Sequence, residues 1–354
     1  MGIIEPFKSF LAGIAAACVC LAISPVSAAA AENGLLLRAE SLTVLPKSKP
    51  VLYVRAANAT EHPIAATVSI EVPSSWKISE SSREVTLAAG EETRIGFPVA
   101  DGDVEEANSY PVTITAASEG GRCVRHQRIA VASAPYFKPE VDGDPRDWKD
   151  AIPVTFATDG RNTTIATYWN RRRFSVLVSV EEERHVGRGD AACFDAVQIA
   201  VAPRGSVTGR SVKEEASRFE YLVYRDVQGE GCCCQLAQPG TKLAEVARRR
   251  SLDPLKHDKA EVVVNRVGTV THYEFSLPLS SVRKHIRPSE GREFYLSVLV
   301  HDPDGTGVRD WGEAAGLWER QRNRLAWSDW VGAKWGNVPP MDCRTEWGMC
   351  SSRY

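Results

Sequence analysis

Short β-prone runs separated by turn-forming residues recur along almost the whole chain, and this spacing constrains the fold more than any other feature. The runs are rich in Val, Ile, Thr and aromatic residues, whereas the 3.6-residue period of amphipathic helices is scarce. Such spacing is typical of β-sandwiches, so we predict an all-β protein. The predicted strands cover residues 50–56, 65–72, 83–87, 93–98, 110–116, 164–169, 174–180, 196–201, 218–224, 260–264, 272–277 and 294–300.

The first 31 residues differ from the rest and predict a signal peptide. An apolar stretch at 10–24 follows Lys8, and Pro25 and the small-residue segment 26–28 come next. This order matches a secretory leader with its cleavage site. The stretch is also short for a membrane span of about 20 residues, and no later segment is long and apolar enough for one. We therefore expect a secreted or periplasmic protein without a membrane span once the leader is removed.

The charge of the chain argues against nucleic acid as a partner. The 43 lysines and arginines nearly balance the 45 aspartates and glutamates, leaving a net charge of −2, whereas nucleic-acid-binding domains usually carry a basic surface. The arginine run 171–173 is expected at a solvated hairpin tip.

Seven cysteines lie beyond the predicted leader, and an exported protein normally pairs its cysteines in disulfides. Cys343 and Cys350 are the nearest candidates for a local pair, although spacing does not fix connectivity. The cysteine run 232–234 lacks a Cys-x-x-Cys partner and paired histidines, so a disulfide-linked loop with one thiol left over is favoured over a metal site.

Proline-rich residues 133–139 predict an extended linker between two domains. The first domain, 32–133, contains the runs VRAAN, ATVSIEVPSSWKI, VTLAAGEETRIGFPV and SYPVTITA. These resemble the immunoglobulin-like domain attached to secreted glycosidases, the alpha-galactosidase-associated family, whose members are usually spacers. Trp76 is expected to fill the core of this sandwich.

The second domain, 138–354, is expected to be one sandwich with a long insertion at 207–259 and a C-terminal tail. Five motifs follow in order: VDGDPRDW, TTIATYWNRRRFSVLVSVEE, FDAVQIAVAP, THYEFSLPLSSV and FYLSVLVHDPDGTG. In this order they resemble the family 9 carbohydrate-binding module, a jelly-roll-like sandwich within the DOMON-like superfamily. The resemblance implies the sandwich fold and contact with a polysaccharide or cell-surface glycan.

The resemblance also implies site residues, with gaps. Sugar-binding members hold a sugar end between two indoles, with a glutamate nearby. Trp327 matches the later indole, whereas the earlier one falls near Ala192 and is absent, and Phe194 is the nearest aromatic residue. The glutamate corresponds to Gln198, whose amide still hydrogen-bonds hydroxyls, and a family arginine falls at Glu220.

Six of the nine tryptophans follow residue 310, interleaved with acidic and arginine side chains. Planar apolar faces beside planar hydrogen-bonding groups suit recognition of a polyhydroxylated ring. Packing against the sandwich is the alternative for the same side chains. The candidates for sugar contact are Trp318, Arg324, Trp327 and Trp330.

An acidic segment before these tryptophans has the spacing of a calcium loop. Carboxylate and hydroxyl oxygens recur at the ligand positions, with glycine at position 6. The alternative is a hairpin turn held by its own side chains, because Asp-Pro-Asp-Gly is also a good turn sequence. A second cluster, within 142–147, has the same two interpretations. The candidate ligands of a structural Ca²⁺ are Asp302, Asp304, Thr306, Asp310 and Glu313.

No catalytic motif accompanies these features. The sequence has no nucleophile elbow, no zinc-protease motif and no Walker loop, so no nucleotide is expected. Only two methionines follow Met1, both near the C-terminus, which argues against haem ligation. We expect a non-catalytic, secreted carbohydrate-binding protein. The alternatives are a glycosidase, hydrolysing O-glycosyl bonds, or an accessory protein of one, and an adhesion or assembly module that packs against a protein partner.

Overall fold

The computed structural model describes residues 34–42, 44–189, 194–203, 218–242, 252–284, 286, 292–310 and 346–350. The all-β prediction is confirmed, because four antiparallel-rich sheets account for most of these residues. The predicted signal peptide lies outside them. Within this part of the chain, no helix has the length and hydropathy needed to cross a bilayer.

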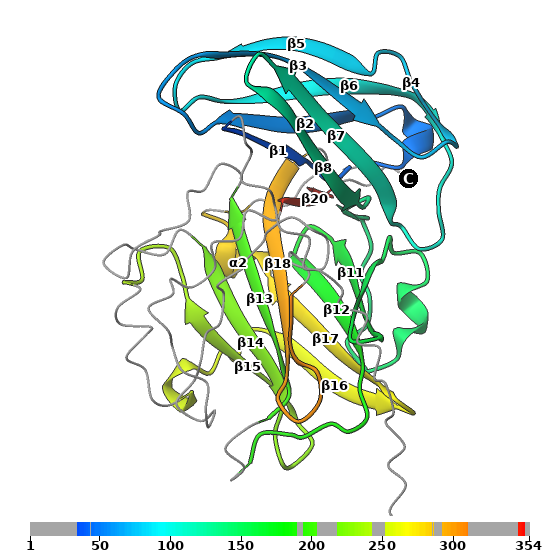
Figure 1. The fold of residues 1–354 in the computed structure, drawn as a ribbon. Helices are drawn as coiled ribbons and strands as arrows, with labels where there is room; N and C mark the ends of the chain where they lie inside the picture. Colours follow the sequence, from blue (N-terminus) through cyan, green and yellow to red (C-terminus); the bar gives the residue numbers. More distant parts are fainter. Residues whose placement is uncertain are drawn as a thin grey trace, which may run out of the picture.

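Two four-stranded sheets form the first sandwich, which lies at the top of Figure 1. Alternate residues of β2 and β3 are buried, as a half-covered sheet requires. Trp76 fills this core as predicted, with 5% of its surface exposed, and its Nε1 donates to the Asp103 carbonyl at 3.1 Å. One sheet has the order β1 (Leu35–Ala39), β2 (Val51–Asn58), β6 (Glu92–Gly102) and β4 (Trp76–Ile78). The other has the order β5 (Ser82–Leu87), β3 (Ile64–Glu71), β7 (Tyr110–Ser118) and β8 (Gly121–Ile129). The 3-10 turn η1 (Pro46–Ser48) precedes β2.

A five-stranded and a seven-stranded sheet form the second sandwich below it (Figure 1). The first has the order β10 (Val154–Thr158), β11 (Arg161–Trp169), β12 (Arg173–Glu181), β17 (Val270–Pro278) and β16 (Glu261–Val267). The second has the order β15 (Gly231–Ala237), β14 (Phe219–Arg225), β13 (Ala196–Pro203), β18 (Arg292–Asp302), β20 (Glu346–Cys350) and β9 (Ser133–Ala134), and β19 (Gly307–Asp310) also pairs with β18. Within its described residues, three short helical segments connect strands: η2 (Pro145–Trp148), η3 (Asp253–Leu255) and α2 (Leu279–Val282).

The centre of the seven-stranded sheet is buried on both faces. Val197, Ile199 and Val201 of β13 point into the core between the two sheets. The alternate residues Ala196 and Gln198 point to the opposite face and are also fully buried. That outer face carries its own apolar cluster, formed by Phe194, Ala196, Leu222, Tyr224, Cys234, Leu236, Ala237 and Leu252.

One prediction about the second sandwich is wrong, and two hold only in part. The cysteine run 232–234 lies in β15 rather than in a disulfide-linked loop, and its three thiols are free. The reason is burial: Cys233 enters the inter-sheet core and Cys234 the outer cluster, so they serve as small apolar residues. The segment 207–259 is not wholly an insertion, because β14 and β15 are paired strands within it. The linker 133–139 begins with β9, which pairs in parallel with β20.

The two sandwiches are joined by a buried side chain. Asn108 Nδ2 donates to the carbonyls of Val131 at 2.9 Å and Pro153 at 2.8 Å, and its Oδ1 accepts from Val131 N at 2.8 Å. Asn108 itself has φ of 45°, a left-handed conformation that asparagine tolerates better than most residues. Asn108 therefore links a loop of the first sandwich to the approach of β10 in the second.

Candidate functional site

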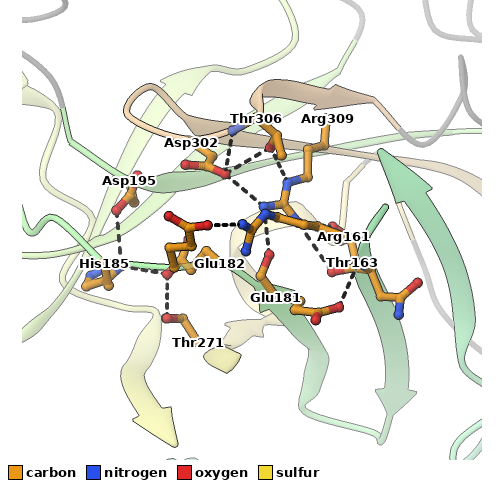
Figure 2. A network of polar contacts seen from close by, with 12 residues as sticks. Arg161, Thr163, Glu181, Glu182, His185, Asp195, Thr271, Asp302, Thr306 and Arg309 are labelled. Atoms are coloured by element: carbon orange, nitrogen blue, oxygen red, sulfur yellow. Dashed lines mark hydrogen bonds and ion pairs between the residues drawn. The ribbon is translucent and has the colours of Figure 1, made fainter. Parts of the chain in front are cut away.

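A rim of polar side chains forms where several strands of the second sandwich end (Figure 2). Glu182 and His185 follow β12, Asp195 precedes β13, and Asp302 ends β18. Neighbouring strands bring these ends together: β13 pairs with β18, so Ala196 lies opposite His301. Asp302 lies more than 100 positions after the other three in the sequence, and the sheet register places all four on one rim.

The hairpin from Asp302 to Asp310 is held by hydrogen bonds that its own side chains make. Asp302 Oδ2 accepts from Thr306 N at 3.0 Å, Thr306 Oγ1 at 2.9 Å and Arg309 Nη2 at 2.8 Å. Burial raises the pKa of Asp302, but these donors and the Arg309 charge outweigh it and lower the pKa below its ordinary value. Asp304 pairs with Arg184 at 2.6 Å. These residues therefore form a hairpin turn held by its own side chains, which was the alternative to a calcium loop.

The calcium-loop prediction meets this geometry only in part. Asp310 lies in β19 opposite Leu299 rather than in a loop that wraps an ion, and Glu313 lies outside the described residues. The second acidic cluster likewise forms turn bonds: Asp144 N donates to Asp142 Oδ1 at 2.9 Å. Calcium binding at either place stays a prediction.

Three side chains at the rim form a compact buried group. His185 Nδ1 lies 3.3 Å from Glu182 Oε1 and 3.6 Å from Asp195 Oδ2, and the Tyr273 hydroxyl lies 3.3 Å from the same nitrogen. Figure 2 shows His185 between the two carboxylates. Glu182 Oε1 also accepts from Thr271 Oγ1. The sequence gives no signal for this group, because its members are not spaced as a motif.

Asp195 has a strongly perturbed acidity. Burial raises its pKa to about 8, and the charges of Glu182, Asp304 and Asp302 act in the same direction, against the opposing hydrogen bond from Val186 N. A buried carboxyl among other carboxylates holds a proton or a cation at neutral pH, because its charge is otherwise uncompensated.

A second polar group lies on the outer face of the seven-stranded sheet. Gln198 Oε1 and His301 Nε2 are 3.1 Å apart, and Arg218 donates to Glu220. All four side chains are buried. Gln198 Nε2 and Glu220 Oε2 have no hydrogen-bond partner among the described residues. Unused polar atoms in a buried setting are rare in proteins and mark places where a ligand or water completes the hydrogen bonding.

The sequence-predicted sugar site is only partly within the described residues. Gln198 of β13 lies on the outer face and is fully buried, and Glu220 of the neighbouring strand β14 lies on the same face. Phe194 is fully buried against Tyr224, with ring centroids 5.3 Å apart, so this aromatic ring packs in the outer cluster rather than forming an open wall. Outside the described residues lie Ala192, Trp318, Arg324, Trp327, Trp330 and Cys343. The Cys343–Cys350 disulfide stays a prediction, since Cys350 is described only as part of β20.

A groove of about 1170 Å³ opens elsewhere on the second sandwich, beside the predicted arginine hairpin tip. Tyr136 is 41% exposed there and meets Trp169 edge-on, at 4.9 Å between ring centroids. The hairpin connects β11 and β12, as predicted, and Arg173 pairs with Glu261 at 2.9 Å. Cationic side chains dominate the polar part of the lining: Lys138, Arg171, Arg172, Arg173 and Arg283.

Two of the sequence motifs meet through Glu274. Its Oε2 accepts from Asp142 N at 2.9 Å and Gly143 N at 2.8 Å, and its Oε1 accepts from Trp148 Nε1 at 3.0 Å. Glu274 is fully buried by this contact. The carboxylate therefore fixes the start of the second sandwich to β17 and is engaged in structure rather than facing an open cleft.

Comparison with known proteins finds similarity only at the level of structure. No protein-family model and no curated protein matches the chain. One similar solved structure is a family 9 carbohydrate-binding module from Caldicellulosiruptor kristjanssonii in complex with cellotriose, with a TM-score of 0.35 and 13% identity; 50% of this chain and 80% of that one are covered. The same module in complex with glucose gives 0.33 and 13%, covering 48% and 77%. The E. coli chaperone DraB gives 0.23 and 12%, covering 58% and 91%.

Proposed function

We propose that this protein binds carbohydrate through the outer face of the seven-stranded sheet, without catalysing a reaction. The observation that carries the proposal is the buried polar group of Gln198, His301, Arg218 and Glu220. Burying polar groups costs free energy unless their hydrogen bonds are completed, and the contacts within this group leave polar atoms of Gln198 and Glu220 without a partner among the described residues.

Sugar hydroxyls match the atoms that remain unused on this face. Gln198 Nε2 is a donor and Glu220 Oε2 an acceptor, each without a partner among the described residues. A hydroxyl both donates and accepts, so one sugar ring has the groups to satisfy both atoms. The aromatic partner expected from the sequence is Trp327, and stacking by that indole is part of the proposal.

The test is titration of the full chain with xylan, cellulose and short oligosaccharides, with binding measured by tryptophan fluorescence and by calorimetry. Gln198→Leu keeps the side-chain volume and removes the amide, so we expect binding to weaken roughly 5- to 150-fold, corresponding to about 1–3 kcal/mol. The melting temperature of each variant establishes that the fold is intact.

A matched control separates this face from the groove beside the arginine hairpin. Tyr136→Ala alters the exposed aromatic of the groove and should leave sugar affinity unchanged. Loss of binding in Tyr136→Ala but not in Gln198→Leu would place the sugar in the groove instead. No response to any glycan would favour a protein partner, and release of reducing sugar would establish a glycosidase.

A further inference from the structure

We propose that Glu182, His185 and Asp195 form a binding site for a divalent transition-metal ion of the Zn²⁺ class. The inference does not rest on sugar binding, because the three side chains lie at the sandwich rim and not on the outer sheet face. Each offers one donor atom, and the three atoms lie within 4.8 Å of one another.

The donor spacing fits a small tetrahedral ion. His185 Nδ1 is 3.3 Å from Glu182 Oε1 and 3.6 Å from Asp195 Oδ2. A tetrahedral site with bonds of about 2.0–2.2 Å places its ligands roughly 3.3–3.6 Å apart. The Tyr273 hydroxyl lies 3.3 Å from the same nitrogen, within the same range of spacing, and a bound water is the alternative fourth ligand.

A hydrogen-bonded histidine alone does not satisfy this group. One Nδ1–H can direct its proton at one acceptor, whereas three oxygen atoms surround that nitrogen. The side chains are 4% exposed for His185, 1% for Glu182 and 0% for Asp195, so water does not compensate them freely. Glu182 Oε2 and Asp195 Oδ1 have no hydrogen-bond partner among the described residues. A metal ion satisfies several of these oxygens at once.

The charge balance points to a cation at Asp195. Three neighbouring carboxylates each have an arginine: Glu182 has Arg266 at 3.3 Å, Asp302 has Arg309 and Asp304 has Arg184. No arginine or lysine pairs with Asp195 within the described part of the chain. A dication bound by Asp195 and the neutral imidazole supplies the missing positive charge.

The donor set favours a transition metal over calcium. Ca²⁺ takes six to eight oxygen ligands, whereas imidazole nitrogen suits Zn²⁺, Cu²⁺ and Ni²⁺. An all-oxygen group also exists, formed by Asp195, Asp302 and Asp304. Arginines engage two of its three members, Asp302 and Asp304, but only Glu182 of the histidine-containing group, which is therefore the better site.

The test uses the full chain without a purification tag, stripped with a chelator and then dialysed against Zn²⁺, Co²⁺ or Ca²⁺. We expect one Zn²⁺ per chain, visible d–d absorption of a tetrahedral Co²⁺ complex, and a melting temperature about 5–10 °C higher at 100-fold excess over Kd. His185→Ala and Asp195→Asn should each abolish the Co²⁺ spectrum and the thermal shift.

Two variants control for other metal-binding groups. His272→Gln removes a half-buried histidine that bonds Ser179 Oγ at 2.9 Å, and Cys232→Ser removes a partly exposed thiol. Both should keep the Zn²⁺ stoichiometry and the Co²⁺ spectrum. Absence of Zn²⁺ binding, unchanged binding in Asp195→Asn and His185→Ala, or a larger thermal shift with Ca²⁺ than with Zn²⁺ would each overturn the proposal.

Discussion

Glu274 offers the sharpest test of how the second sandwich is held together. Its carboxylate accepts two backbone N–H groups on one oxygen and the Trp148 indole N–H on the other. Glu274→Gln preserves shape but leaves one oxygen. The amide oxygen can face the two backbone donors or the indole, and its NH₂ group then faces the remaining donor.

The expected loss of stability follows from the number of hydrogen bonds that the amide can no longer accept. One hydrogen bond to a charged acceptor is lost, which contributes about 1.5–3 kcal/mol. Burial raises the pKa of Glu274 above its ordinary value, although its hydrogen bonds oppose this. The charge is therefore costly to bury, and the neutral amide recovers part of that cost. We expect Glu274→Gln to destabilise the second sandwich by about 1–2 kcal/mol.

Chemical denaturation of single and double variants measures the interaction directly. Trp148→Phe removes the indole donor while leaving a ring to pack on Tyr168, whose centroid lies 5.0 Å away. Because both changes remove the same hydrogen bond, their effects should be less than additive, by roughly 1 kcal/mol or more. Trp76→Phe, which loses a bond to a neutral carbonyl in the first sandwich, should add independently to Glu274→Gln. Full additivity of the Glu274 and Trp148 variants would refute the reasoning.

Three further predictions concern pH, the junction and the rim. Burial raises the pKa of Glu40, but Arg94 and Arg55 outweigh it and lower the pKa below 4.5. The stabilising contribution of the Glu40 carboxylate is therefore present above pH 4.5 and lost as the pH falls below it. Between pH 6 and 3, the free energy of unfolding measured in urea should fall less steeply for Glu40→Gln than for the unchanged protein. Asn108→Ala loses three hydrogen bonds and should cost about 2–4 kcal/mol, measured by denaturation. Arg309→Met leaves Asp302 buried without its partner and should destabilise the second sandwich by about 3–5 kcal/mol, measured by calorimetry; an unchanged melting profile would contradict the assigned network.

The strand runs could be predicted from sequence because alternation and β-branched residues are local signals. All twelve predicted strands correspond to observed ones, from Val51–Asn58 to Arg292–Asp302. The strands that were missed carry weaker signals. Gly121–Ile129 places Arg122, His126 and Arg128 on its exposed face. Gly231–Ala237 contains three consecutive cysteines, which indicate chemistry before they indicate a strand.

The candidate sites depend on contacts that no local pattern contains. Motif order placed Gln198 on a strand, but its burial beside His301 follows from the pairing of β13 with β18. The acidic spacing from Asp302 onward predicted ligands for calcium, whereas the side chain of Arg309, within the same segment, supplies a cation to Asp302. Because Arg309 pairs with Asp302, the acidic segment is stabilised by a cation from its own chain.

Strand β13 connects the two proposals. Asp195 precedes the strand and Gln198 lies three residues later, so an ion at the rim would fix the start of the strand that carries the proposed sugar contact. If the strand is already rigid through its pairing with β14 and β18, removing the ion should lower stability and leave sugar affinity unchanged. If the rim positions Gln198, Asp195→Asn should weaken sugar binding without contacting sugar, and excess Zn²⁺ should fail to restore it. The extensive pairing of β13 favours the first result.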